Sequence, residues 1–240
     1  YPRGTDGSYK DKPLRLLVQL NFEKLPHIED FPRQGILQIF LACENDCLYG
    51  FDFNSADEQT DQNGFRVIYH KDIITDTSLL ISDDDIPCDS FSSDEYDFPL
   101  KKEFILCAEE PDKCPATPDD YRFSNALVSS YSEIMGQEVS NYWNIDGYDT
   151  LYDRCPESVA FIGGYPRFTQ SDPREDCPSL EGFDRVLFEL GSLQGEEITS
   201  WGGHDFDIIW GDVGTGVFLI PAEKLRACDF SEVVYNYDCG

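Results

Sequence analysis

Apolar and polar side chains alternate near the start of the chain, and this alternation predicts the first strand. Between residues 14 and 20 every even position is leucine or valine, so these side chains share one face of an extended segment. Residues 35–42 are almost all apolar, which is typical of a strand buried on both faces. β-branched and aromatic residues favour another strand at 65–70. Shorter apolar runs predict further strands at 48–53, 102–108, 185–190, 207–210, 216–220 and 231–238.

A helical spacing of apolar residues marks the middle of the chain, where we predict one principal helix over 117–136. Thr117 is the expected N-cap and Pro118 the first helical residue. Gly136 is expected to end the helix. The predicted buried face consists of Phe123, Leu127, Tyr131 and Ile134.

Shorter elements complete the predicted order. Single helical turns are expected at 148–154 and 221–225. In the stretch 161–174 a pair of glycines precedes Pro166, which indicates a turn into an extended segment and opens the second run of strands.

The two ends of the chain resemble each other. Three pairs of segments match in the same order, namely 15–20 with 185–190, 35–39 with 216–220, and 65–72 with 231–238. The identities that carry the match are Arg15 with Arg185, Gly35 with Gly216, Tyr69 with Tyr235, and Asp72 with Asp238. We therefore predict a mainly β fold of two related β halves, an internal duplication, with a helical insert between them. Two copies of one β unit can bury each other's apolar faces.

The predicted organisation has three parts that together form one compact domain. Residues 1–100 are the first β copy, 101–160 are an acidic linker and the helical insert, and 161–240 are the second β copy.

Four segments, at 17–22, 35–40, 163–170 and 210–214, carry a family resemblance. Together and in this order they resemble the YwqG-like family, whose members are mainly bacterial and have no established activity. The resemblance implies a duplicated, mostly β fold and no particular reaction. Members of that family carry a glycine-glycine-x-proline segment before the first strand. This chain lacks it, so we expect the first copy to be truncated at its start.

The chain is strongly acidic, with 47 Asp and Glu residues against 18 Lys and Arg residues and a net charge of −29. This balance argues against nucleic acid and anionic membranes as partners, because both require a basic surface. No apolar run approaches the ~20 residues of a membrane helix, so we expect no membrane contact. The charge suits a basic protein partner, although solubility alone is an equally good explanation.

The nine cysteines are odd in number and lack the paired spacing of a structural zinc site. We expect reduced thiols and a cytoplasmic location. We expect no cofactor and no metal. The cluster of His204, Asp205 and Asp207 is explained by the acidic composition, and the aspartates at 83–85 lack the spacing of a calcium loop.

Two features suggest where a site would lie. In 210–216 three glycines surround Asp212, which is either a ligand-binding carboxylate or a turn residue beside a core Trp210. In the first strand of each half an arginine and a polar residue lie four positions apart, on what alternation predicts to be one face. These side chains either pair with nearby carboxylates or face a cleft between the halves. The predicted ligand-binding residues are Arg15, Gln19, Tyr165, Gln170, Arg185, Glu189, Trp210 and Asp212.

The leading functional hypothesis is a non-enzymatic cytoplasmic binding or interaction protein with a basic partner, of which an immunity-type or regulatory role would be one form. It rests on the charge and on the lack of a convincing catalytic set. The alternative is an enzyme or small-ligand binder with a site between the two halves, and a third hypothesis is a purely structural subunit. A deep polar pocket at the predicted residues would favour the alternative, and a flat acidic face would favour the leading hypothesis.

Overall fold

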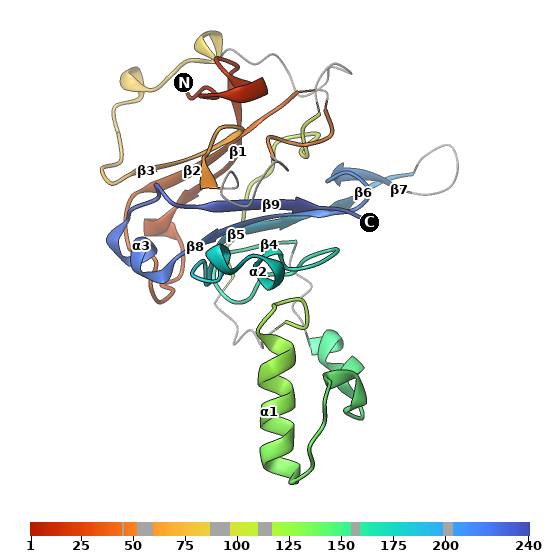
Figure 1. The fold of residues 1–240 in the computed structure, drawn as a ribbon. Coiled ribbons are helices and arrows are strands. Elements are labelled where there is room, and N and C mark those ends of the chain that lie inside the picture. The colour runs from red at the N-terminus through yellow and green to blue at the C-terminus, as the bar shows by residue number, and fades with distance from the viewer. Residues whose placement is uncertain (45, 52–59, 87–96, 110–116, 155–158, 199–203) are drawn as a thin grey trace.

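A computed structural model describes the chain apart from residues 45, 52–59, 87–96, 110–116, 155–158 and 199–203 (Figure 1). The fold is mainly β. The strands are β1 Leu14–Asn21, β2 Ile36–Ala42, β3 Phe65–His70, β4 Ala160–Phe161, β5 Arg185–Gly191, β6 Leu193–Ile198, β7 His204–Ile208, β8 Thr215–Ile220 and β9 Val234–Asp238. The α-helices are α1 Phe123–Met135, α2 Pro173–Asp176 and α3 Ala222–Ala227.

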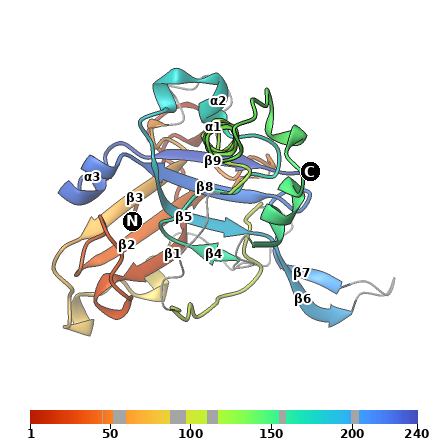
Figure 2. The same ribbon diagram turned by 90° about the horizontal axis from the view of Figure 1, so that it is seen from below.

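The strands form three antiparallel sheets. The first sheet has the order β1-β2-β3, the second has the order β4-β5-β8-β9, and β6 pairs with β7. The first and second sheets lie against each other as two layers, while the β6-β7 hairpin projects to one side (Figures 1 and 2). Within the described ranges, no helix has the length and apolar content to cross a membrane.

The core fills the space between these two sheets. One buried cluster contains Leu37 and Ile39 from the first sheet and Phe218, Ile220 and Tyr235 from the second. The rings of Phe218 and Tyr235 stack with their centroids 4.7 Å apart. Each sheet therefore buries the apolar face of the other, which explains why the central strands β2 and β8 carry so few polar residues.

A β-bulge in β1 changes which side chains share a face. The register with β2 shifts between Leu16 and Val18. Leu14 and Leu16 consequently pack in a small cluster on the outer face, whereas Val18 and Leu20 lie in the core between the sheets. The prediction that all even positions from 14 to 20 share one face is wrong, because one extra residue in a strand reverses the alternation beyond it.

The same displacement occurs in β5. Its register with β8 shifts between Val186 and Phe188, so Val186 packs on the outer face and Phe188 in the core. The bulge lies between Arg185 and Glu189, so the expected common face for these two residues is also wrong. The bulge in β1 separates Arg15 from Gln19 in the same way.

The principal helix starts later than predicted and projects away from both sheets (Figure 1). It begins at Phe123, because Thr117 is held elsewhere, its hydroxyl donating to the Pro166 carbonyl at 2.5 Å. Gly136 ends it in the left-handed conformation, as predicted. Ile134 is 79% exposed rather than buried, since no sheet lies beside the far end of the helix.

Of the other local predictions, some are confirmed and some are wrong. The turn expected near 221–225 is α3, and 148–154 forms a 3₁₀ helix. The strand predicted at 48–53 is a turn as far as residue 51, beyond which it lies outside the described residues, and 102–108 is irregular. Both runs are apolar enough for a strand, but among the described residues neither pairs with a neighbouring strand.

Candidate functional site

One of the predicted site residues, Glu189, is buried on the outer face of the second sheet. Glu189 of β5 accepts hydrogen bonds from Arg167, from the backbone N–H at 2.9 Å and from Nε at 3.0 Å. The segment that supplies Arg167 also carries Tyr165 and Gln170, and the Arg122 guanidinium lies over the Tyr165 ring, 5.6 Å from its centroid. The Gln170 amide donates to the Asp238 carboxylate at 2.9 Å, which fixes the segment to the end of β9.

Glu189, Asp119 and Asp238 are a group of interacting carboxyls with raised pKa values, which we call the Glu189 cluster. Burial raises the pKa of Glu189 to about 8, against the charge and hydrogen bonds of Arg167. Burial also raises the pKa of Asp119 and of Asp238, which repels Asp119. Of the three, Glu189 has a pKa that allows it to hold a proton at neutral pH. Such a shift is common in functional sites and also in buried ion pairs.

A second buried network lies beside the first and is built on Arg174, whose side chain is fully buried. Its guanidinium donates to Asp172 at 2.6 Å and to Asp120 at 3.0 Å. Asp172 also accepts the Tyr121 amide at 2.9 Å and caps α2. Although burial acts to raise it, hydrogen bonds from Arg122 hold the pKa of Asp120 below its usual value. This network joins the chain just before α1 to α2 and, through the Phe183 carbonyl, to the chain that leads into β5, so its evident role is structural.

Arg15 and Arg185, the arginines at matching positions in the two halves, lie away from Glu189. Arg185 donates to Asp30 at 3.0 Å and to Asp184 at 2.8 Å, the carboxylate pairing expected on structural grounds. Arg15 is buried with its guanidinium over the Phe98 ring, 5.2 Å from the centroid. Gln19 is exposed and accepts a hydrogen bond from its cross-strand neighbour Gln38 at 2.7 Å.

Trp210 and Asp212 also lie apart from the Glu189 cluster. Trp210 is fully buried between Tyr49 and Tyr237, with ring centroids 5.4 and 5.8 Å away. A Cβ at Gly216 would lie 2.5 Å from the Trp210 ring, so the ring requires glycine in β8. Asp212 is exposed in the turn that follows. The glycine-rich stretch is thus a tight connection around a core tryptophan.

Two residues of the cluster His204, Asp205 and Asp207, which was considered as a metal site, form ion pairs with lysines. Lys101 binds Asp205 at 3.0 Å, and Lys102 binds Asp207 at 2.6 Å. The described part of the chain contains no group of three or more His, Cys, Asp or Glu side chains placed to hold a metal ion. Of the nine cysteines, Cys47, Cys107, Cys177, Cys228 and Cys239 carry free thiols, Cys43 is buried, and Cys88, Cys114 and Cys155 lie outside the described residues.

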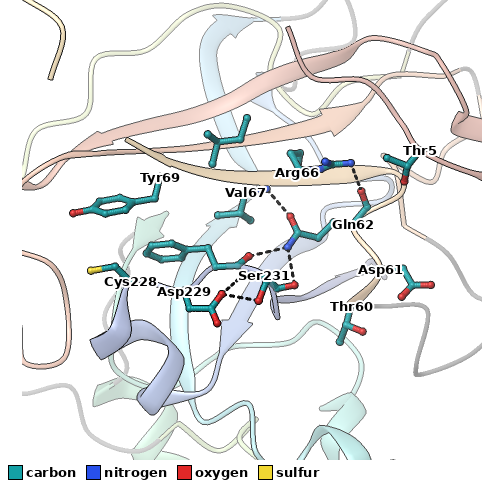
Figure 3. Close-up of a pocket in the computed structure, with 12 residues that line it drawn as sticks. Thr5, Thr60, Asp61, Gln62, Arg66, Val67, Tyr69, Cys228, Asp229 and Ser231 are labelled. Atoms are coloured by element: carbon teal, nitrogen blue, oxygen red, sulfur yellow. Dashed lines mark hydrogen bonds between the residues drawn. The ribbon is translucent and has the colours of Figure 1, made fainter. Parts of the chain in front are cut away.

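A cavity of about 580 Å³ lies where the edge of the first sheet meets the chain that leads into β9 (Figure 3). We call it the seam cavity. Its lining comes from three parts of the chain and consists of Thr5, Thr60, Asp61, Gln62, Arg66, Val67, Ile68, Tyr69, Cys228, Asp229, Phe230 and Ser231. Gln62 is a buried member of this lining. Its carboxamide oxygen accepts the Val67 amide at 2.8 Å, and its nitrogen donates to the Phe230 carbonyl at 2.9 Å.

A second feature is a segment that projects from the two sheets. Residues 123–151, which we call the arm, comprise α1 and the turns that fold back beside it, and they project below the second sheet (Figure 1). Tyr142 packs against Phe123, Trp143 and Tyr148 with ring centroids 4.1 to 6.0 Å apart. None of the three buried apolar clusters of described residues includes an arm side chain. The arm is therefore held together by its own aromatic residues.

Comparison with known proteins places the chain in a family. Residues 1–239 match the family described as Domain of unknown function (DUF1963). The chain belongs to this DUF1963 family. No curated protein matches it. The DUF1963 match spans the sheets, the arm and the seam cavity, so all three belong to one family unit.

The seam cavity of this DUF1963 chain could not be predicted from the sequence. Gln62 lies in a polar loop, and Ser231 lies 169 positions later along the chain. No local pattern connects two such segments. The sequence relates 65–72 to 231–238 only as matching copies of one segment, which neither places them side by side nor specifies a cavity.

Proposed function

We propose that this DUF1963 protein is a non-enzymatic interaction protein that binds a basic protein partner through the arm. The observation that carries the proposal is the exposure of large apolar side chains on an element that covers nothing. Ile134 is 79% exposed, and Met135 and Trp143 are more than half exposed. Exposed apolar groups gathered on one projecting element are typical of interaction surfaces.

The charge of the arm supports a basic partner. Residues 123–151 contain the acidic residues Glu133, Glu138, Asp146 and Asp149 and no lysine or arginine. The whole chain carries a net charge of −29, so a basic partner is attracted at long range. The complementary surface on the partner would be an apolar groove with basic residues at its rim, which suits a helix that inserts an apolar stripe.

The internal duplication, with the arm and its flanks as an insert, belongs to the same proposal. It is supported by the matching order of β1-β2-β3 and β5-β8-β9. It is also supported by the two bulges, at Leu17 and Leu187, which occupy equivalent positions when 15–20 is aligned with 185–190. We further propose that the chain falls among the YwqG-like proteins, that it acts in the cytoplasm, and that it does not bind nucleic acid or membranes.

The alternative is an enzyme or small-ligand binder with a site between the two halves. Its support is the seam cavity, whose volume falls within the range of about 300–1,000 Å³ for ligand sites. The perturbed carboxyls of the Glu189 cluster are less suitable, because Glu189 is 1% exposed and already holds Arg167.

Affinity purification from the native host tests the proposal with two matched double variants. The arm variant combines Ile134→Asp and Met135→Asp. The control combines Leu79→Asp and Leu80→Asp, which are also exposed but lie outside the arm. We expect one basic protein to be retained by the wild type and the control, to be lost from the arm variant, and to elute with added salt. Equal retention by the arm variant, or an acidic partner, would contradict the proposal.

A further inference from the structure

We propose that the seam cavity receives an extended peptide from a partner protein, which adds as a strand along the free edge of β3. This inference is independent of the arm. It rests on the edge of the first sheet, on the geometry of Gln62 and on the lining of the cavity.

β3 is an edge strand with open hydrogen-bonding groups. Among the strands that the structure describes, it pairs with β2 alone. The Val67 amide donates to Gln62 and so points away from β2. Backbone groups of alternate residues point the same way in an antiparallel strand, so the Tyr69 N–H and the carbonyls of Val67 and Tyr69 also face outward. Within the described residues these three groups have no backbone partner.

The Gln62 side chain spans the gap between the β3 edge and residues 230–231. A peptide group within a sheet presents its C=O to one neighbouring strand and its N–H to the other. The Gln62 carboxamide does the same, with its oxygen on the Val67 amide and its nitrogen on the carbonyls of Phe230 and Ser231, at 2.9 and 3.4 Å (Figure 3). The gap between β3 and 230–231 is therefore one peptide group wide. The Gln62 side chain fills this gap at one point. An added strand could occupy the rest of the gap along β3.

The lining indicates what kind of peptide would fit. Tyr69 and Phe230 line the cavity on the core side, where both pack with the central apolar cluster. Thr5 and Arg66 line it on the other side. Successive side chains of a strand point to opposite faces, so the peptide is expected to alternate apolar and polar residues. Backbone hydrogen bonds would supply affinity, and the apolar positions would supply selectivity.

The test uses a phage-displayed library of random linear peptides selected on the full chain. Ser231→Trp blocks the rim of the cavity without changing a buried residue, and Ser179→Trp is a matched control at an exposed position outside the cavity. We expect alternating apolar and polar peptides that bind the wild type and the control equally and bind Ser231→Trp about tenfold more weakly or worse. An N-methyl scan should show losses at alternate peptide positions, and peptide binding should slow hydrogen exchange at the Tyr69 amide.

Three results would overturn the inference. One is a selection in which no peptide distinguishes the wild type from Ser231→Trp. Another is a peptide that tolerates N-methylation at every position. The third is binding that depends on a peptide carboxylate and is lost with Arg66→Gln while the Tyr69 amide exchanges unchanged, which would indicate a small-oxyanion site on Arg66.

Discussion

At the scale of single residues, buried charge is concentrated on the outer face of the second sheet. Glu189 and Arg174 are almost inaccessible to water. Each is tolerated because its neighbours supply hydrogen bonds of the right kind, two from Arg167 to Glu189 and a set of carboxylate and carbonyl acceptors around Arg174. The difference between them lies in protonation, because an arginine stays charged when buried and a glutamic acid does not have to.

Glu189 should make the free energy of unfolding depend on pH between 4.5 and about 8. Its pKa is 4.5 in an ordinary setting and about 8 in the folded protein. Between these values the folded state holds a proton that the unfolded state has lost, so the free energy of unfolding falls as pH rises through this window. We expect a loss on the order of a few kcal/mol across the window, and Glu189→Gln should remove most of that slope.

Urea unfolding at a series of pH values measures the effect. Glu23→Gln, at an exposed position, is the control and should keep the slope of the wild type. A Glu189→Gln protein with an unchanged slope would show that Glu189 is ionised throughout and paired with Arg167.

At the scale of elements, the arm depends on its base. The arm has no apolar contact with the sheets among the described clusters, and its connection runs through Asp120, Asp172 and Arg174. Two elements that share no core can keep a defined orientation when a buried, fully hydrogen-bonded network joins them. The position of α1 is therefore a property of this network rather than of the helix itself.

Arg174→Met tests that dependence. It keeps an apolar side chain of similar length but leaves two buried carboxylates short of a partner, so we expect a loss of about 3–5 kcal/mol in the free energy of unfolding. Hydrogen exchange in residues 119–123 should rise as well. Arg226→Met is the control, because the Arg226 side chain is 57% exposed and an exposed pair contributes only about 0–1 kcal/mol. Equal effects of the two variants would argue against the network as the anchor of the arm.

At the scale of the whole molecule, the net charge of −29 opposes compactness. Surface ion pairs such as that between Lys101 and Asp205 offset little of it, because basic residues are outnumbered by acidic ones. The repulsion acts over the whole surface, so it responds to ionic strength rather than to any one substitution.

Added salt should therefore stabilise the protein. We expect the midpoint of thermal unfolding to rise between about 0.01 and 0.15 M NaCl, over which the screening length falls from about 30 to 8 Å. Sucrose at matched osmolality controls for solute exclusion and should not reproduce the rise over this range. A midpoint that falls with salt would mean that favourable ion pairs outweigh the repulsion.

The sequence by itself determined the strands that form the core. β1, β2, β3, β5 and β8 lie within a residue or so of their predicted ranges, because their alternation or apolar continuity is a local property. Gly136 was predictable for the same reason, since only the local conformation matters at a helix end. The grouping of Tyr165, Gln170 and Glu189 in one ligand site stays a prediction.

The tertiary structure alone decided which faces and which surfaces these elements present. The bulges at Leu17 and Leu187 depend on pairing with β2 and β8, so no periodicity within β1 or β5 could reveal that they separate Arg15 from Gln19 and Arg185 from Glu189. The exposure of Ile134 depends on where the base of α1 is anchored, and the seam cavity depends on two segments far apart in the chain. Burial and pairing are properties of neighbours in space, whereas periodicity records only neighbours along the chain.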